Sequence, residues 1–318
     1  MAVLDVTDLQ VAFGPARILR GISLSLEAGH TLGVVGESGC GKSMTGMAIM
    51  GMIPFPGRVT SGSIQLNGRE LVGLKGRDMR EVRGKEIALV MQDPFTSLNP
   101  MMRVGWQIAE ALRIHRGMNR TESWKRAVEL LDEVGVPAPE SSAKKYPHQM
   151  SGGQRQRVVI AIAFACRPKV LIADEPTTAL DVTLQAQILR LIRDLKQQEG
   201  TAVMLISHDI GVIGSLASRV SVFYAGKVVE MGASRDVLLR PTHPYTRALL
   251  SAMPNRNVQK LNVIEGHPPD LTKKLAGCAF APRCEYRFDQ CSNDPQLVSV
   301  RKDQDSACWK SEELVART

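Results

Sequence analysis

Three features are scarce in this chain of 318 residues: long apolar runs, aromatic side chains and blocks of like charge. The longest uninterrupted apolar run, Val158–Cys166, has nine residues, well short of the roughly 20 that cross a bilayer as a helix. The first residues, MAVLDVTDLQVAFG, lack the positive segment and following apolar segment of a secretory signal. We therefore expect a soluble, cytoplasmic protein.

The charge pattern argues against a nucleic-acid-binding protein. The net charge is +8, but the basic residues are scattered and form no block of five or six. Aromatic residues make up only 4% of the chain, too few for a surface on which bases stack. With 44% hydrophobic and 23% charged residues, the composition is that of an ordinary globular protein. We expect no nucleic acid among its partners.

The hydrophobic pattern predicts an α/β protein with an antiparallel β piece at its start. Short alternating runs separated by turn residues fill most of the first 70 positions. Later, strands at residues 169–175 and 201–209 flank a helix at 183–200, and another helix is expected at 121–134. From about Pro241 the periodicity weakens, so a domain boundary is expected near residues 235–260.

The segment GESGCGKS fits the phosphate-binding pattern G-x-x-x-x-G-K-[ST]. It follows a predicted strand at 31–36 and opens a predicted helix at 42–53, which is the context the motif requires. Backbone N–H groups and the helix N-terminus would hold phosphates, with the lysine reaching the β- and γ-phosphates and the serine hydroxyl binding Mg²⁺. The alternative is a glycine-rich turn with an incidental lysine. The predicted ATP-binding residues here are Gly36, Glu37, Ser38, Gly39, Cys40, Gly41, Lys42, Ser43 and Met44.

An apolar strand ending in two acids supplies the second part of a nucleotide site. The segment KVLIADEP delivers Asp174 and Glu175 to the carboxyl end of the strand, where ligands bind in open α/β sheets. Asp174 is placed to hold Mg²⁺ and Glu175 to polarise an attacking water. Such a strand is common by itself, but its pairing with the phosphate loop indicates ATP hydrolysis.

A third segment, MSGGQRQR, precedes a predicted helix. Ser151 is at the N-cap position, and Gly152 and Gly153 expose backbone N–H groups. Such a segment can grip a phosphate, although SGG alone is also typical of a linker. Because the chain already has a phosphate loop, this would be a second, separate phosphate-binding segment, which includes Gln154.

With LIADEP, TALD (residues 178–181) and ISHD (206–209), these motifs resemble the nucleotide-binding subunit of an ABC transporter. The resemblance implies an ABC-type P-loop fold with a mixed sheet core, an antiparallel β subdomain and a helical signature subdomain at about 95–165. It implies that Gln92 senses Mg²⁺, that His208 contacts the γ-phosphate, that Phe13 stacks on adenine and that Asp181 is the D-loop acid. Met150 stands where the family usually has leucine. For Phe13, a place in the strand core is the alternative.

The mechanism that the resemblance implies explains the second phosphate-binding segment. Two subunits close head to tail over two ATP molecules, and Ser151 and Gly153 of one meet the γ-phosphate held by Lys42 of the other. Closure on ATP and release after hydrolysis then drive attached membrane proteins, by positioning and electrostatics.

Three further segments narrow the resemblance: QDPFTSLNPMM, YPHQMSGGQRQRV and HPYTRALLSAMP. They resemble the dipeptide/oligopeptide/nickel importers, and most closely the first of their paired ATPase subunits. This implies an ATPase domain at 1–240, an importer-type C-terminal region at 241–318, a second ATPase subunit, two permease subunits, an extracytoplasmic solute-binding protein and a place at the cytoplasmic face of the membrane. The alternatives are import of nickel or another small solute by the same family, or a non-transport ABC ATPase of DNA repair or translation.

The C-terminal region contains four cysteines: Cys278, Cys284, Cys291 and Cys308. A reducing compartment disfavours disulfides, so clustered cysteines favour a metal. The C-x₂₋₄-C pair usual for zinc is absent, whereas four cysteines suit a [4Fe–4S] cluster, which the importer resemblance also implies. An iron–sulfur cluster in a small cysteine-rich appendage is therefore expected, with zinc or unligated thiols as alternatives. A thiol near a helix N-terminus can have a lowered pKa, which is one interpretation of Cys40, and a merely tolerated small residue at this position is the alternative.

Overall fold

The computed structural model describes residues 2–178, 180–252, 264–273 and 275–316. The chain forms two compact units. The first comprises residues 1–3, 26–30 and 73–205, and the second comprises residues 4–25, 31–72 and 206–318. In the described part of the chain, no helix combines the length and apolar character needed to span a membrane.

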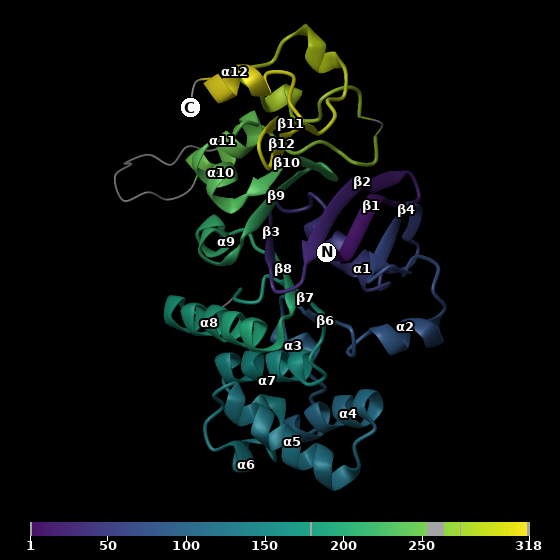
Figure 1. Cartoon of the computed structure of the whole chain (residues 1–318), viewed down its shortest axis with the longest axis vertical. Coiled ribbons are helices and arrows are strands. Elements are labelled where there is room, and N and C mark those ends of the chain that lie inside the picture. Colours follow the sequence, from purple (N-terminus) through teal and green to yellow (C-terminus); the bar gives the residue numbers. More distant parts are fainter. Residues whose placement is uncertain (1, 179, 253–263, 274, 317–318) are drawn as a thin grey trace. The chain divides into compact units, whose positions relative to one another are not determined.

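The first unit combines buried strands with a group of helices (Figure 1). Its strands follow the order β8-β7-β6, and β6 and β7 are parallel. The strand β7 is buried except at Asp174, as expected for a strand covered on both faces. The elements are β6 (Ile87–Val90), β7 (Val170–Asp174), β8 (Ala202–Ile206), α2 (Gly76–Val82), α3 (Pro94–Ser97), α4 (Val104–Arg116), α5 (Arg120–Glu133), α6 (Pro139–Ser142), the 3₁₀ turn η1 (Pro147–Gln149), α7 (Gly152–Phe164) and α8 (Val182–Glu199).

Helices α4, α5 and α7 pack together in this unit (Figure 1). Their apolar residues recur at helical spacing and are buried, including Ile108 and Leu112 of α4 and Leu130 of α5. The helix α5 begins with a capping box, in which Asn119 and Glu122 exchange side-chain and backbone hydrogen bonds.

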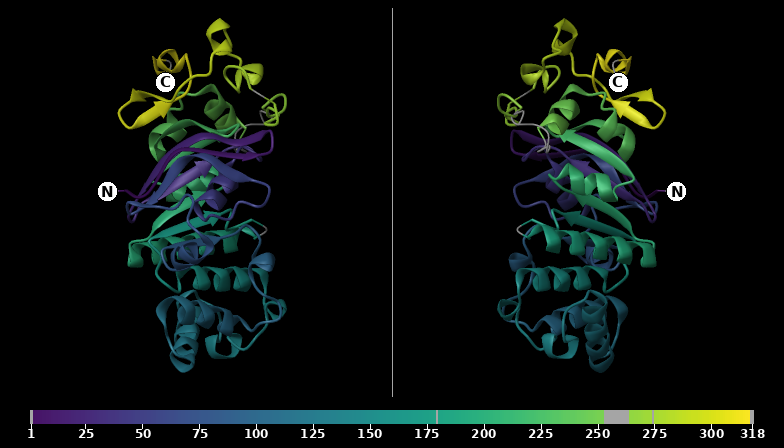
Figure 2. Two further views of the ribbon diagram at one scale, coloured as in Figure 1. Left: turned by 90° about the vertical axis from the view of Figure 1, so that its right-hand side faces the viewer. Right: turned by 90° about the vertical axis from the view of Figure 1, so that its left-hand side faces the viewer.

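The second unit contains two sheets (Figures 1 and 2). A four-stranded sheet with the order β2-β1-β4-β5 is formed by β1 (Ala2–Phe13), β2 (Ala16–Glu27), β4 (Arg58–Leu66) and β5 (Arg69–Glu70). Antiparallel pairing of β1 with β4 and of β4 with β5 confirms the antiparallel piece expected at the start of the chain.

The other sheet of this unit follows the order β11-β12-β10-β9-β3 and is mixed. The strand β3 is parallel to β9, whereas β9, β10, β12 and β11 pair antiparallel in turn. The elements are β3 (Thr31–Val35), β9 (Arg219–Tyr224), β10 (Lys227–Ala233), β11 (Val298–Arg301), β12 (Gln304–Ser306), α1 (Lys42–Ile49), α9 (Ile210–Leu216), α10 (Ser234–Leu239), α11 (Pro244–Ser251), η2 (Ala281–Arg283), η3 (Asp289–Ser292) and α12 (Ser311–Ala316).

The C-terminal region is not a separate appendage, contrary to expectation. Its strand β12 pairs with β10 and thereby extends the sheet that contains β3. The contact rests on a buried polar centre: Glu230 of β10 accepts hydrogen bonds from Thr242, His243 and Gln304. The hydrophobic periodicity of this segment is weak, so the sequence did not predict these long-range pairings.

Candidate functional site

The phosphate loop joins β3 to α1 within the second unit. All five residues of β3 are buried, and α1 begins at Lys42 with Gly41 as its N-cap. Gly36 and Gly41 have φ values of 149° and 107°, and a Cβ at either position would overlap Phe223 or Leu19, respectively. Only glycine therefore allows this close backbone path.

Lys42 lies inside the loop, with 7% of its surface exposed. Its Nζ donates hydrogen bonds to the carbonyl oxygens of Gly36, at 2.7 Å, and Glu37, at 2.9 Å. The loop thus surrounds a buried cation at a helix N-terminus, which is an arrangement suited to phosphate. Ser38, Gly39 and Ser43 are exposed on the loop and the first turn of α1, and Met44 is half-buried.

Cys40 does not have a lowered pKa. It is 5% exposed, and burial raises the pKa of its thiol above the usual value despite the neighbouring Lys42. The helix N-terminus does not compensate for the loss of solvation, so Cys40 is a buried neutral thiol.

His208 lies at the same end of the second unit's sheet as the phosphate loop. The backbone N–H of Ser207 donates to the carbonyl oxygen of Val34, next to the end of β3. His208 follows as an exposed residue, and Asp209 then caps α9 by accepting from the N–H groups of Gly211 and Val212.

Phe13 ends β1 and is half-buried. Its ring lies directly over Gly57, where any Cβ would overlap the ring atoms. The ring is therefore neither fully in the core nor fully exposed, and adenine stacking remains a prediction.

In the first unit, a carboxylate receives two hydrogen bonds at the carboxyl end of β7. Gln92 Nε2 donates to Glu175 Oε2 at 2.9 Å, and Thr178 Oγ1 donates to the same oxygen at 2.8 Å. Asp174 is the last residue of β7. The structure thus brings Gln92 and Glu175 together, although they are 83 positions apart in the sequence.

Ser151 caps α7 as the sequence predicts. Its hydroxyl accepts from the N–H of Gln154, while the Gln154 side chain accepts from the N–H of Ser151. Ser151 is exposed, Gly152 and Gln154 are half-buried, and Gly153 packs beside Leu184. A partner could therefore reach the start of this helix.

Asp181 caps the following helix, α8. Its Oδ1 accepts from the N–H of Leu184 at 2.9 Å. Ala179 of the TALD segment lies outside the described residues, as do residues 253 and 254 of the HPYTRALLSAMP segment.

The prediction of an iron–sulfur or zinc site is wrong. Cys278, Cys284, Cys291 and Cys308 line one small cavity and are all free. Within the described ranges, however, no group of three or more His, Cys, Asp or Glu side chains could hold a metal ion. Burial raises the pKa of Cys284 and Cys308 to about 11, so these unligated thiols are neutral near pH 7. Of the alternatives, unligated thiols remain.

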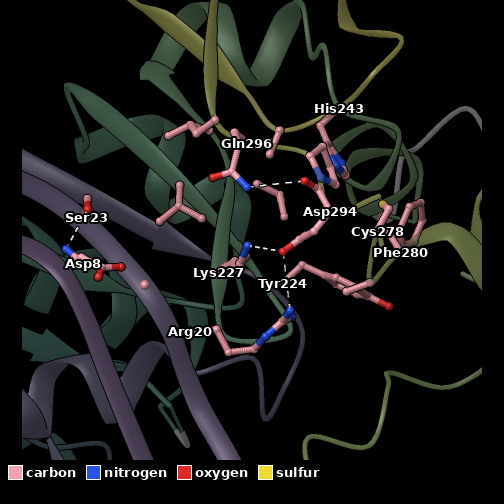
Figure 3. Close-up of a pocket in the computed structure, with 17 residues that line it drawn as sticks. Asp8, Arg20, Ser23, Tyr224, Lys227, His243, Cys278, Phe280, Asp294 and Gln296 are labelled. Carbon is pink, nitrogen blue, oxygen red and sulfur yellow. Dashed lines mark hydrogen bonds and ion pairs between the residues drawn. The ribbon is translucent and has the colours of Figure 1, made fainter. Parts of the chain in front are cut away.

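A cavity of about 320 Å³ lies where the C-terminal region meets β2, β9 and β10 (Figure 3). Asp294 lies between two cations there, with Lys227 Nζ at 2.5 Å and Arg20 Nη2 at 3.8 Å (Figure 3). Asp294 thus links the C-terminal region to β10 of the mixed sheet and to β2 of the four-stranded sheet.

Sequence reasoning missed two residues that contact the phosphate loop from the C-terminal region. Arg283 forms an ion pair with Glu37, and the Tyr245 hydroxyl accepts from the N–H of Glu37. Both residues lie in segments that stand out in the sequence, HPYTRALL and the cysteine-rich stretch. Nothing in either segment indicates a contact more than 200 positions away.

Two family models match the chain. Residues 19–178 match the ABC transporter model, and residues 229–291 match the model of the oligopeptide/dipeptide transporter C-terminal region. Among solved structures, a dimeric ATP-binding cassette in a post-hydrolysis state, bound to ADP and Pi, has a TM-score of 0.65 and 28% identity. The match covers 73% of this chain and 99% of that chain.

Curated relatives match over almost the full length. A probable peptide ABC transporter ATP-binding protein of Sinorhizobium fredii is 48% identical, over 98% of this chain and 96% of the relative. An oligopeptide transport ATP-binding protein of Salmonella typhimurium is 45% identical, over 98% and 95%. A dipeptide transport ATP-binding protein of Escherichia coli is 45% identical, over 97% and 96%. The chain therefore belongs to the ABC transporter family, among the ATP-binding proteins of oligopeptide and dipeptide transport.

Proposed function

We propose that this chain hydrolyses ATP to power the import of dipeptides or oligopeptides across the bacterial cytoplasmic membrane through partner permease subunits. The observation that carries the ATP part is the phosphate loop, in which buried Lys42 lies at the start of α1 within a glycine-dependent turn. The peptide part is supported by the match of residues 229–291 and by the names of the relatives.

The chemistry follows the ATPase roles that the resemblance assigns. Lys42 and the loop N–H groups bind the phosphates, Glu175 polarises the attacking water and His208 contacts the γ-phosphate. Ser151 of one subunit contacts the ATP held by its partner. Mg²⁺ neutralises phosphate charge when bound, and the side chains assigned to it, Ser43, Gln92 and Asp174, offer the hydroxyl, amide and carboxylate oxygens that this ion prefers.

The proposal includes the assembly and the domain plan. We assign a second ATPase subunit, two permease subunits and an extracytoplasmic solute-binding protein as partners, with this chain peripheral at the cytoplasmic face. Residues 1–240 form the ATPase domain, with the helical subdomain at about 95–165, and residues 241–318 form the importer-type region.

Uptake by cells tests this proposal. A strain without the gene is complemented with the wild-type chain, Lys42→Ala or the exposed-lysine control Lys302→Ala, and accumulation of a radiolabelled tripeptide is measured. Wild type and Lys302→Ala should restore uptake, whereas Lys42→Ala should not. Normal peptide uptake in the deletion strain, with nickel uptake or survival of DNA damage impaired instead, would contradict the proposal.

A further inference from the structure

Within the described residues, the C-terminal region contacts the phosphate loop at Glu37. The two carboxylate oxygens of Glu37 accept from the two terminal nitrogens of Arg283, at 2.7 and 2.8 Å. This parallel geometry is the strong form of an arginine–carboxylate pair. The Arg283 side chain is 4% exposed and that of Glu37 is 23% exposed, so the pair is mostly shielded from water.

Arg283 is itself fixed in place. Its Nε donates to the carbonyl oxygen of Glu265 at 2.9 Å, and its terminal nitrogens donate to the Ile264 carbonyl and the Tyr224 hydroxyl, both at 3.3 Å. The guanidinium also lies near the rings of Tyr224 and Phe280. An arginine held on all sides can position its partner rather than follow it.

The main chain of Glu37 is held as well. Its N–H donates to the hydroxyl of Tyr245 at 2.8 Å, and Tyr245 is fully buried against Tyr224 and Phe280. Its carbonyl oxygen accepts from Lys42. All polar groups of Glu37 are thus engaged: the C-terminal region holds the side chain and the N–H, and the phosphate-binding lysine holds the carbonyl.

We infer that Arg283 and Tyr245 are positioning residues for ATP binding, which hold the phosphate loop in the conformation that accepts phosphate. The inference rests on the proposed ATP site at Lys42. Neither side chain is assigned a contact with nucleotide. Their effect is on the fraction of molecules whose loop is ready to bind, and the apparent dissociation constant rises as that fraction falls.

The test measures equilibrium binding of a fluorescent ATP analogue, and the KM and kcat of hydrolysis, with the full chain. Arg283→Met and Tyr245→Phe should raise Kd and KM about tenfold each, as when the ready fraction falls to about one tenth. Saturating ATP restores the loop, so kcat should change by less than about twofold. The matched controls Arg287→Met and Tyr286→Phe, in the same segment, should bind as wild type. Tyr245→Phe keeps the buried ring and so guards against loss of folding.

A double-mutant cycle separates this role from general destabilisation. Glu37→Gln and Arg283→Met should each raise Kd, and the double variant should be no worse than Arg283→Met alone. Additive losses in the double variant, or wild-type affinity in both Arg283→Met and Tyr245→Phe, would overturn the inference about positioning. If Lys42→Ala still lost ATP binding in that case, the proposed ATP site would stand. Retained binding in Lys42→Ala would instead overturn the proposed function.

Discussion

Replacing the buried carboxylate of Glu230 should loosen the C-terminal region from its sheet. Glu230 is fully buried, and its Oε1 accepts from the Thr242 N–H at 2.7 Å, the Thr242 hydroxyl at 2.8 Å and Gln304 Nε2 at 2.8 Å. Its Oε2 accepts from the N–H of His243 at 3.1 Å. One side chain therefore joins β10, the start of α11 and β12.

Glu230→Gln keeps the shape and one oxygen. The remaining oxygen can still accept three hydrogen bonds, but these lack the extra strength of a charged acceptor. The new NH₂ group faces the N–H of His243, which then has no acceptor. A buried donor left unsatisfied costs about 1–3 kcal/mol. Two donors, the new NH₂ group and the N–H of His243, then lack an acceptor, so the cost is about 2–6 kcal/mol. The variant avoids burying a charge, which offsets part of this cost, and the expected net loss of unfolding free energy is about 2–4 kcal/mol. This corresponds to a fall in Tm of roughly 4–16 °C for a unit of this size.

Glu230→Ala should lose more, since all four hydrogen bonds disappear. Thermal unfolding followed by circular dichroism measures the loss, and hydrogen exchange of the peptide covering residues 240–247 locates it. The control Glu312→Gln, at an exposed position, should stay within about 0.5 kcal/mol of wild type. A Glu230→Gln protein with wild-type Tm and unchanged protection at Thr242 and His243 would refute the reasoning.

Three further outcomes follow from the site and its surroundings. Glu175→Gln should retain ATP binding but lose about 10²–10⁴-fold in turnover, in a phosphate-release assay with Glu199→Gln as control; wild-type turnover would mean that Glu175 is not the catalytic carboxylate. Burial lowers the pKa of His243 to about 3, so as the pH falls this histidine is protonated in the unfolded chain before it is protonated in the folded protein. The free energy of unfolding should therefore fall by about 1.4 kcal/mol per pH unit below about pH 6.5. His243→Asn, which keeps a helix cap, should remove that part of the slope, and an identical slope in both proteins would contradict this role. Cys40, buried and with a raised pKa, should resist iodoacetamide at pH 7.5 until the protein unfolds, and rapid labelling of native protein in mass spectra would argue against its burial.

The parts of the site that are local in sequence could be predicted, because their geometry is set by neighbouring residues. The phosphate loop needs glycine at Gly36 and Gly41, and Ser151 caps the helix that it precedes. The antiparallel start was also predictable, since alternation of apolar residues sets the faces of a strand.

The parts that depend on distant contacts could not be predicted. Arg283 contacts Glu37 across 246 positions, and the three-residue strand β12 pairs with β10 although more than 70 positions separate them. The four C-terminal cysteines illustrate the opposite error: their clustering in the sequence suggested a metal, but within the described residues no group of three or more potential ligands could hold one. Spacing in the sequence does not determine this three-dimensional arrangement.

Transport by the purified assembly tests the central claim most directly. The complex is co-purified through this chain, its subunits are identified, and it is placed in proteoliposomes with the solute-binding protein and a radiolabelled oligopeptide. We predict that permease subunits co-purify and that peptide crosses the membrane only with ATP, and not when Glu175→Gln replaces the wild-type chain. Peptide transport at the wild-type rate in that variant, or ATP hydrolysis without any peptide movement, would contradict the account.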